Sequence, residues 1–211
     1  MDIGYWGKQD ASIYFCEDEY EYSYWIAEYY NTMSSISYIL VGMLFLTSKI
    51  RNLAICLIMV GFGSMFLHGT LRYYGQWWDE GAMLVLSFEG IRYFKPNTNY
   101  LYLLLLLFVY ILFYNCSLIF LSLFAGLQLY LVVLGYRNIR INNDFELLLF
   151  RGYIGFFGVA LVFWTMDQFL CDVIGDPVYA HSLWHVFSAL GCLCAFIRMA
   201  ELDYLLNYLH N

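Results

Sequence analysis

Charged side chains are scarce in this sequence, and those of positive sign are the scarcest. Asp, Glu, Lys and Arg make up 13% of the 211 residues, whereas an ordinary soluble domain carries roughly 25%. With 10 Lys and Arg against 17 Asp and Glu, the chain lacks the basic surface of a nucleic-acid-binding protein, so no nucleic acid partner is expected. The sequence also contains no fixed-period repeat and no low-complexity linker.

Hydrophobic residues are abundant instead. They account for 62% of the chain, and aromatic residues for 21%, which excludes a disordered protein and indicates an integral membrane protein. Seven membrane helices of ~20 residues would occupy ~140 residues. Little of the chain then remains for loops, so a separate soluble domain is not expected.

Stretches without Asp, Glu, Lys or Arg predict most of the membrane spans. A polar hairpin near Asn115 divides the longest of them into two spans. One further span, 77–93, is weak because it contains Asp79, Glu80 and Glu89. The charge-free stretches are 29–48, 52–71, 96–136, 177–197 and the shorter 152–166, whose span extends past Asp167 to about 170.

The distribution of basic residues decides whether 77–93 crosses the bilayer. If it does, only Lys8 and Arg72 lie on one side of the membrane, and the other eight basic residues lie on the opposite side, as the positive-inside rule expects. These eight are Lys49, Arg51, Arg92, Lys95, Arg137, Arg140, Arg151 and Arg198.

The predicted fold is therefore all-α, an integral membrane protein with seven transmembrane helices. Its N-terminus is lumenal or outside, and its C-terminus is cytosolic. The predicted organisation is a lumenal acidic N-terminal segment (1–28), a seven-helix transmembrane domain (29–198) and a short cytosolic tail (199–211). The sequence makes no prediction of oligomeric state.

Ionisable side chains inside membrane spans are costly and indicate function by default, and here they cluster. Ser64 and His68 are four residues apart, as are His181 and His185, so each pair shares one helix face. Asp79 opens the following span. The predicted topology places all five at a similar depth in the outer half of the bilayer.

Three imidazoles at one depth are typical of a zinc site with an open fourth position, where zinc lowers the pKa of a water to ~7. Asp79 would act as general base and acid, and Ser64 would hydrogen-bond the water or an oxyanion. Two plainer interpretations stand beside this one. A histidine pair at this spacing also occurs in simple helix packing, and a serine in a span often bonds its own backbone.

Together these residues resemble the alkaline ceramidase family, within a seven-helix hydrolase superfamily that also includes adiponectin-receptor-like proteins. The resemblance covers most of the chain. It rests on GYWG at 4–7, CED at 16–18, WIAEYYNT at 25–32, GSMFLH at 63–68, TLRY at 70–73, DE at 79–80, FWTMD at 163–167, CD at 171–172 and HSLWH at 181–185.

The resemblance implies an amidase that cleaves ceramide into sphingosine and a fatty acid. It implies the zinc ligands His68, His181 and His185, with Asp79 as the general base and acid and Ser64 assisting. A ceramide-type lipid from the bilayer is then the expected substrate, and the endoplasmic reticulum or Golgi membrane is the expected location.

The resemblance also implies a calcium site in the acidic N-terminal segment. The matching ligands are Glu17, Glu19, Glu28 and the carbonyl of Phe15, since calcium prefers 6–8 oxygen ligands. The family pattern has Asp at Tyr14, Trp at Phe15 and Asn at Glu19, so the ligand set is altered here. The alternative is an acidic lumenal surface without a bound ion.

A disulfide between Cys16 and Cys171 is a further expectation, because both lie in family-like blocks on the predicted lumenal side. Cys116 is a competing partner near the same face. Asp167 could join the calcium ligands or hold the N-terminal segment, although capping or solvation at the interface would also account for it. Packing is expected for the cysteines inside spans, Cys56, Cys192 and Cys194.

Two other classes of function remain open. Another lipid hydrolase or an adiponectin-receptor-like protein would share the metal ligands but should lack the block at 16–31. A seven-helix receptor would not need three histidines and a carboxylate at one depth. A proton-coupled transporter could use them, but the sequence has no paired broken helices.

Overall fold

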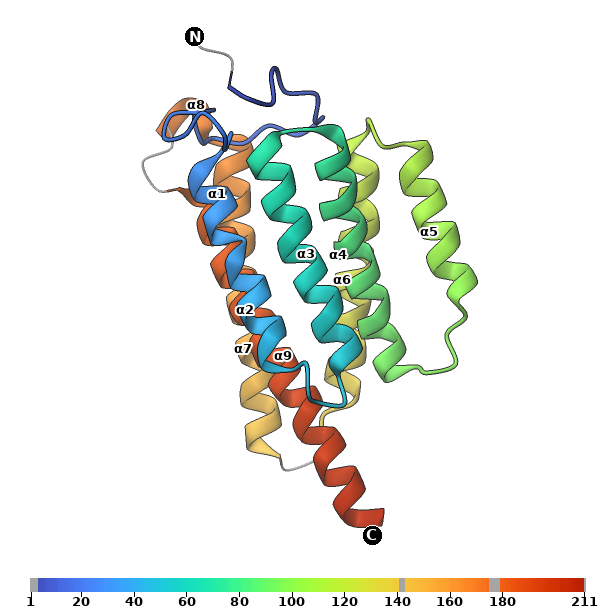
Figure 1. The fold of residues 1–211 in the computed structure, drawn as a ribbon. Coiled ribbons are helices and arrows are strands. Elements are labelled where there is room, and N and C mark those ends of the chain that lie inside the picture. The colour runs from blue at the N-terminus through green and yellow to red at the C-terminus, as the bar shows by residue number, and fades with distance from the viewer. Residues whose placement is uncertain (1–3, 141–142, 175–178, 211) are drawn as a thin grey trace.

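The chain folds into a bundle of long helices in the computed structural model, which describes residues 4–140, 143–174 and 179–210 (Figure 1). Over those ranges the regular structure is helical and contains no strand, so the predicted all-α class is confirmed. Asn211, and residues 177 and 178 of the last predicted span, lie outside the described residues. The helices are α1 (Tyr29–Ser34), α2 (Ile36–Leu44), α3 (Arg51–Thr70), α4 (Tyr73–Phe94), α5 (Tyr100–Leu112), α6 (Ser117–Arg137), α7 (Asp144–Phe169), α8 (Cys171–Ile174) and α9 (Ala180–His210).

Every predicted span coincides with a helix, but several bounds were wrong. The first span is divided at Ser35 and ends at Leu44 rather than at 48. Helix α7 begins at Asp144 rather than at 152, because its charged first turn is capped by Asn143, whose side chain accepts a hydrogen bond from the Glu146 N–H. The search for charge-free stretches missed this capped start. Helix α9 continues past residue 198 without a break.

Four helices in the described ranges are long and apolar enough to cross a bilayer: α3, α6, α7 and the Ala180–Glu201 part of α9. Large apolar side chains on their outer faces are exposed, as at Leu129, Leu148 and Val162. Such a surface would be unfavourable in water but suits hydrocarbon. Helix α4, with its acidic residues, falls outside this set, yet it packs against both α3 and α6 inside the bundle.

Helices α3 and α4 form a tight antiparallel pair. A Cβ atom on Gly63 would lie 2.9 Å from the Asp79 Cα, and one on Gly75 would lie 2.8 Å from the Leu67 Cα. The two helices therefore touch backbone to backbone, because glycine has no side chain to separate them. The connection between them is only two residues long, and its first residue, Leu71, has a left-handed φ of 50°.

The N-terminal segment, residues 4–28, lies across the end of the bundle where α3 meets α4 (Figure 1). The Leu71 carbonyl accepts hydrogen bonds from the backbone of Asp10 and Ala11, both at 3.2 Å, which offsets the strain at Leu71. Arg72 and Asp10 form an ion pair at 2.7 Å. The turn and the segment thus hold each other in place.

A disulfide joins this segment to α8, the short helix that follows α7. Cys16 and Cys171 are bonded, with their Cα atoms 5.4 Å apart. The Asp167 carboxylate accepts a hydrogen bond from the Cys16 N–H at 3.0 Å. Asp167 therefore holds the N-terminal segment, which is one of the roles expected for it, while Cys116 is a free thiol.

Except for Lys8 and Arg72, the basic residues lie toward the other end of the bundle, in or near the α2–α3, α4–α5 and α6–α7 connections (Figure 1) and at Arg198 on α9. There the buried Glu146 bonds the Arg140 guanidinium. Arg198, also buried, donates to the Gly135 carbonyl at 3.0 Å. The bundle is therefore asymmetric, with an acidic cap at one end and a basic network at the other.

Because Gly63 lets α4 approach so closely, the Gly63→Ala variant should be less stable than the parent by about 1–3 kcal/mol. Gly81→Ala is the matched control, since a Cβ there meets nothing within 4 Å, and it should be neutral or stabilising by up to about 1 kcal/mol. Thermal unfolding of both variants in detergent measures this. Equal melting temperatures for the two variants would contradict the close contact.

Candidate metal centre

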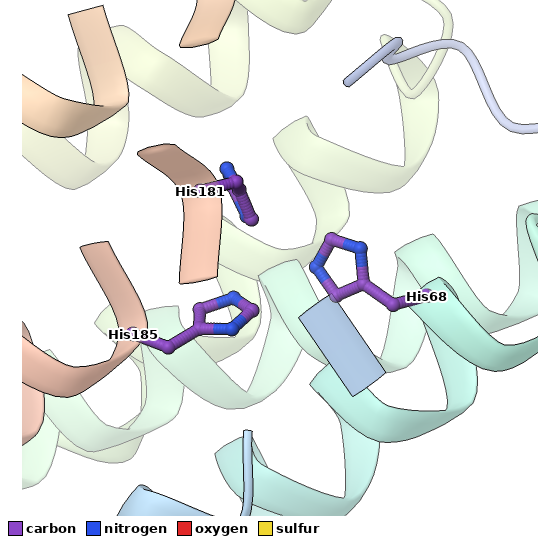
Figure 2. Close-up of side chains that lie close together, drawn as sticks. All are labelled: His68, His181 and His185. Carbon is purple, nitrogen blue, oxygen red and sulfur yellow. The ribbon is translucent and has the colours of Figure 1, made fainter. Parts of the chain in front are cut away.

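Three histidines come together at the end of the bundle covered by the N-terminal segment. His68 lies in the last turn of α3, and His181 and His185 lie at the start of α9. Figure 2 shows their rings facing a common space, with centroids 4.7–5.0 Å apart. All three are buried, and their ligand nitrogens lie within 4.8 Å of one another. They form a possible three-histidine metal site.

Acidic residues lie against Nδ1 of two of these rings. Glu28 Oε2 is 2.6 Å from His68 Nδ1. Asp167 Oδ2 is 3.2 Å from His181 Nδ1, an ion-pair distance without the alignment of a hydrogen bond. A carboxylate behind a histidine is the usual outer partner of a metal ligand, because it orients the ring and makes the other nitrogen a better donor.

Serine takes the same position behind the third ring. Ser34 Oγ is 2.8 Å from His185 Nδ1. Ser64 Oγ is 3.3 Å from His185 Nε2 and 2.9 Å from Ser35 Oγ. In all three rings Nδ1 therefore faces an outer partner. Nε2 of His185 faces Ser64, and Nε2 of His68 has no hydrogen-bond partner among the described residues.

His68 provides the test of whether a metal fits. Its side chain is fully buried, and Nε2 has no hydrogen-bond partner among the described residues. A buried nitrogen left unpaired is unfavourable by about 1–3 kcal/mol, and a metal ion would satisfy it. Three neutral imidazoles suit zinc, so the donor set fits that ion.

Asp79 lies on α4 at the level of Ser64. The Asp79 backbone touches Gly63, the residue before Ser64, and Ser64 in turn contacts His185. One carboxylate oxygen of Asp79, Oδ1, is buried and has no hydrogen-bond partner within the described ranges. A carboxylate in this state has an oxygen available to accept a proton.

Three of the four predicted calcium ligands are carboxylates with different surroundings. Glu17 accepts hydrogen bonds from the Tyr30 and Asn31 N–H groups at 2.7 and 2.8 Å and so caps the start of α1. Glu28 faces His68, and Glu19 is exposed. Among the residues that the structure describes, these three carboxylates do not form a metal-binding group.

Two of these residues instead shape the surroundings of the histidines. The Phe15 ring packs on the His68 and His181 rings, with centroids 4.5 and 4.3 Å away, and covers them. Burial raises the pKa of the Glu28 carboxyl to about 8, and the hydrogen bond from Asn31 opposes the shift. A cation held by His68 would favour the ionised carboxylate.

Sequence reasoning missed the serines behind His185. Ser34 and Ser35 lie in the first charge-free span, and two adjacent hydroxyls there were the available signal. Their role depends on α1 packing against α9, which residue spacing does not reveal.

An apolar cavity lies inside the bundle, and its lining includes residues that flank His185 on α9 but none of the three histidines. Tyr38, Trp184 and Ser188 line its upper part, and the Tyr38 ring lies 5.6 Å from the His185 ring. Aliphatic, aromatic and methionine side chains form most of its walls, and Arg198 lies at its lower end. The cavity could therefore hold a hydrocarbon chain with its polar end at the histidines.

These features define a class: a helical bundle with an apolar outer surface, a possible three-histidine metal site and an apolar cavity inside the bundle. Comparison with known proteins specifies it further. The chain belongs to the Ceramidase family, whose sequence profile matches residues 7–210.

Similar proteins include an alkaline ceramidase of Arabidopsis thaliana, 29% identical over 90% of this chain and 83% of the relative. Alkaline ceramidase 1 of Mus musculus is 26% identical over 92% of this chain and 81% of its own length. Alkaline ceramidase 3 of Mus musculus is 28% identical over 89% of this chain and 82% of its own length.

The contact between Glu28 and His68 predicts that Glu28→Gln weakens zinc binding. The amide lacks the negative charge that strengthens the His68 donor, so zinc affinity should fall about 10–100-fold. Zinc titration against a competing chelator measures this. Glu19→Gln is the matched control, because Glu19 is exposed, and it should bind zinc like the parent. An equal loss in both variants would contradict a direct role for Glu28.

Proposed function

We propose that this protein is a zinc-dependent hydrolase that cleaves the amide bond of a ceramide-type lipid, releasing sphingosine and a free fatty acid. The three buried histidines, whose ligand nitrogens lie within 4.8 Å of one another, carry the proposal. Membership of the Ceramidase family supports ceramide as the substrate class. The apolar cavity supports a substrate drawn from the bilayer, since Trp184 and Ser188, which line it, flank His185 on α9.

The residues divide the reaction between them. The cavity holds a hydrocarbon chain, so the amide lies near His68, His181 and His185. Zinc bound by these residues would supply Lewis-acid chemistry, polarising the carbonyl and making water more acidic. Asp79 accepts a proton from a water molecule while the water oxygen attacks the carbonyl carbon of the amide. Asp79 then returns this proton to the amide nitrogen as the C–N bond breaks. The Ser64 hydroxyl donates a hydrogen bond to the oxygen that becomes negative.

Calcium modulation is a separate hypothesis. It is supported by the acidic N-terminal segment, where Glu19 is exposed and Glu17 and Glu28 lie nearby in the chain. Glu17 caps α1 and Glu28 contacts His68, so these contacts use part of the binding capacity of the two carboxylates. A calcium ion there would act on the zinc site through Glu28.

We also propose seven membrane spans with a lumenal N-terminus, in an endoplasmic reticulum or Golgi membrane. The gathering of basic residues at the end opposite the histidines supports this orientation. An Asn-linked glycosylation acceptor fused to the N-terminus should be modified in cells, and one fused to the C-terminus should not. The reverse result would contradict the orientation.

Purified protein should release sphingosine from ceramide, and chelation should abolish the activity until zinc is restored. Asp79→Asn should lower kcat about 10²–10⁴-fold, because it removes the proton acceptor, and should retain zinc. His185→Ala should lose both zinc and activity, because it removes a ligand. Released sphingosine and bound zinc, measured on the same samples, check these outcomes.

Calcium added after zinc is restored tests the modulation in the same assay. Activity that ignores calcium in the parent would contradict it. A parent that binds zinc but releases no sphingosine from any ceramide would overturn the assignment of substrate. Phospholipids and other lipid amides would then be the substrates to examine.

A further inference from the structure

Arg198 lies at the end of the cavity far from the histidines. Its side chain is buried, with 3% exposed, and it lines the cavity wall. One terminal nitrogen donates to the Gly135 carbonyl at 3.0 Å. Nε has no hydrogen-bond partner among the residues described. A buried guanidinium with an unused N–H is a strong donor without an acceptor.

The charge around Arg198 is not balanced. Glu146 is the acidic residue beside it, but Glu146 bonds the Arg140 guanidinium and the Asn143 side chain. The nearest contact of Arg198 to Glu146 is 3.8 Å, longer than a hydrogen bond. Two arginines thus share one carboxylate, and the local charge is positive.

The cavity extends far enough along α9 for a lipid chain. Trp184 and Arg198, which both line it, lie 14 positions apart, which is ~21 Å along a helix that rises 1.5 Å per residue. The hydrocarbon core of a bilayer is ~30 Å for two opposed chains, so one chain spans ~15 Å. The walls between the two ends are mostly apolar, as at Leu57, Val60 and Phe157. Ser87, Gln128 and Tyr153 also line the cavity, but they hydrogen-bond one another.

We propose that this cavity binds a free long-chain fatty acid, with its carboxylate on Arg198 and its chain directed toward the histidines. The carboxylate supplies the acceptor that Nε lacks and neutralises the excess positive charge. A neutral lipid chain of equal length would fill the cavity but would leave Nε of Arg198 without an acceptor. The inference concerns binding alone; competition of such a fatty acid with ceramide for the cavity is a consequence that rests on the proposed function.

The test compares palmitate with hexadecanol on the full chain in zwitterionic lipid nanodiscs at pH 8. Equilibrium dialysis of the labelled compounds gives both dissociation constants without any turnover. Palmitate should bind the parent at least about tenfold more tightly, equivalent to about 1.4 kcal/mol. Arg198→Gln should remove this preference while hexadecanol binding stays the same, and Arg198→Lys should retain part of it.

Two further variants serve as controls. Arg92 also has a buried Nε without a hydrogen-bond partner among the described residues, but it pairs with Glu89 and does not line the cavity. Arg92→Gln should therefore keep the preference for palmitate. His185→Ala should also keep it; loss of the preference there would instead place the carboxylate at the histidines and overturn the proposal.

Equal binding of palmitate and hexadecanol to the parent would also overturn the proposal. This comparison uses only the parent protein, so it does not depend on the folding of a variant.

Nanodiscs that contain phosphatidylglycerol test the alternative that the anion bound by Arg198 is a phospholipid headgroup. Displacement of palmitate by this lipid, at equal charge density, would assign Arg198 to a phospholipid headgroup instead of a fatty acid. Sphingosine release, assayed separately, reports on the proposed function and does not alter these binding outcomes.

Discussion

The buried contact between Glu28 and His68 ties together the parts of this protein that matter for function. The Glu28 carboxylate lies 2.6 Å from His68 Nδ1, and the Glu28 N–H donates to the His68 carbonyl at 2.9 Å. An acidic side chain buried in a low-dielectric interior needs such a partner. The pair therefore joins the N-terminal segment to α3, and it leaves His68 Nε2 facing the other two histidines.

The need of buried polar groups for partners also explains how α4 is accommodated inside the bundle. Glu80 is buried, yet its carboxylate accepts hydrogen bonds from Tyr110 at 2.6 Å and from Gln76 at 3.0 Å. Asp79 beside it retains a buried oxygen without a partner in the described structure. Of two adjacent acids, one is satisfied and structural, and the other is left with capacity for chemistry, a contrast typical of functional sites.

The bundle also separates two kinds of polar end by an apolar interior. Histidines and carboxylates meet under the N-terminal segment, whereas arginines surround Glu146 at the other end. The cavity runs between them. An amphipathic lipid has one polar end and a long apolar chain, so a cavity of this form can select both the orientation of a ligand and the end that is presented for reaction.

Composition and spacing alone predicted the all-α class, the helix at 77–93 despite its acids, and the pairing of His181 with His185 on one helix face. These are local properties, because a helix repeats every 3.6 residues and apolar side chains seek lipid. The partners of the histidines could not be predicted in this way. Ser34 lies 151 residues from His185, and Glu28 lies 40 from His68. Only the packing of α1, α3, α7 and α9 decides which polar groups meet, since burial compels each of them to find a partner, however distant in the chain.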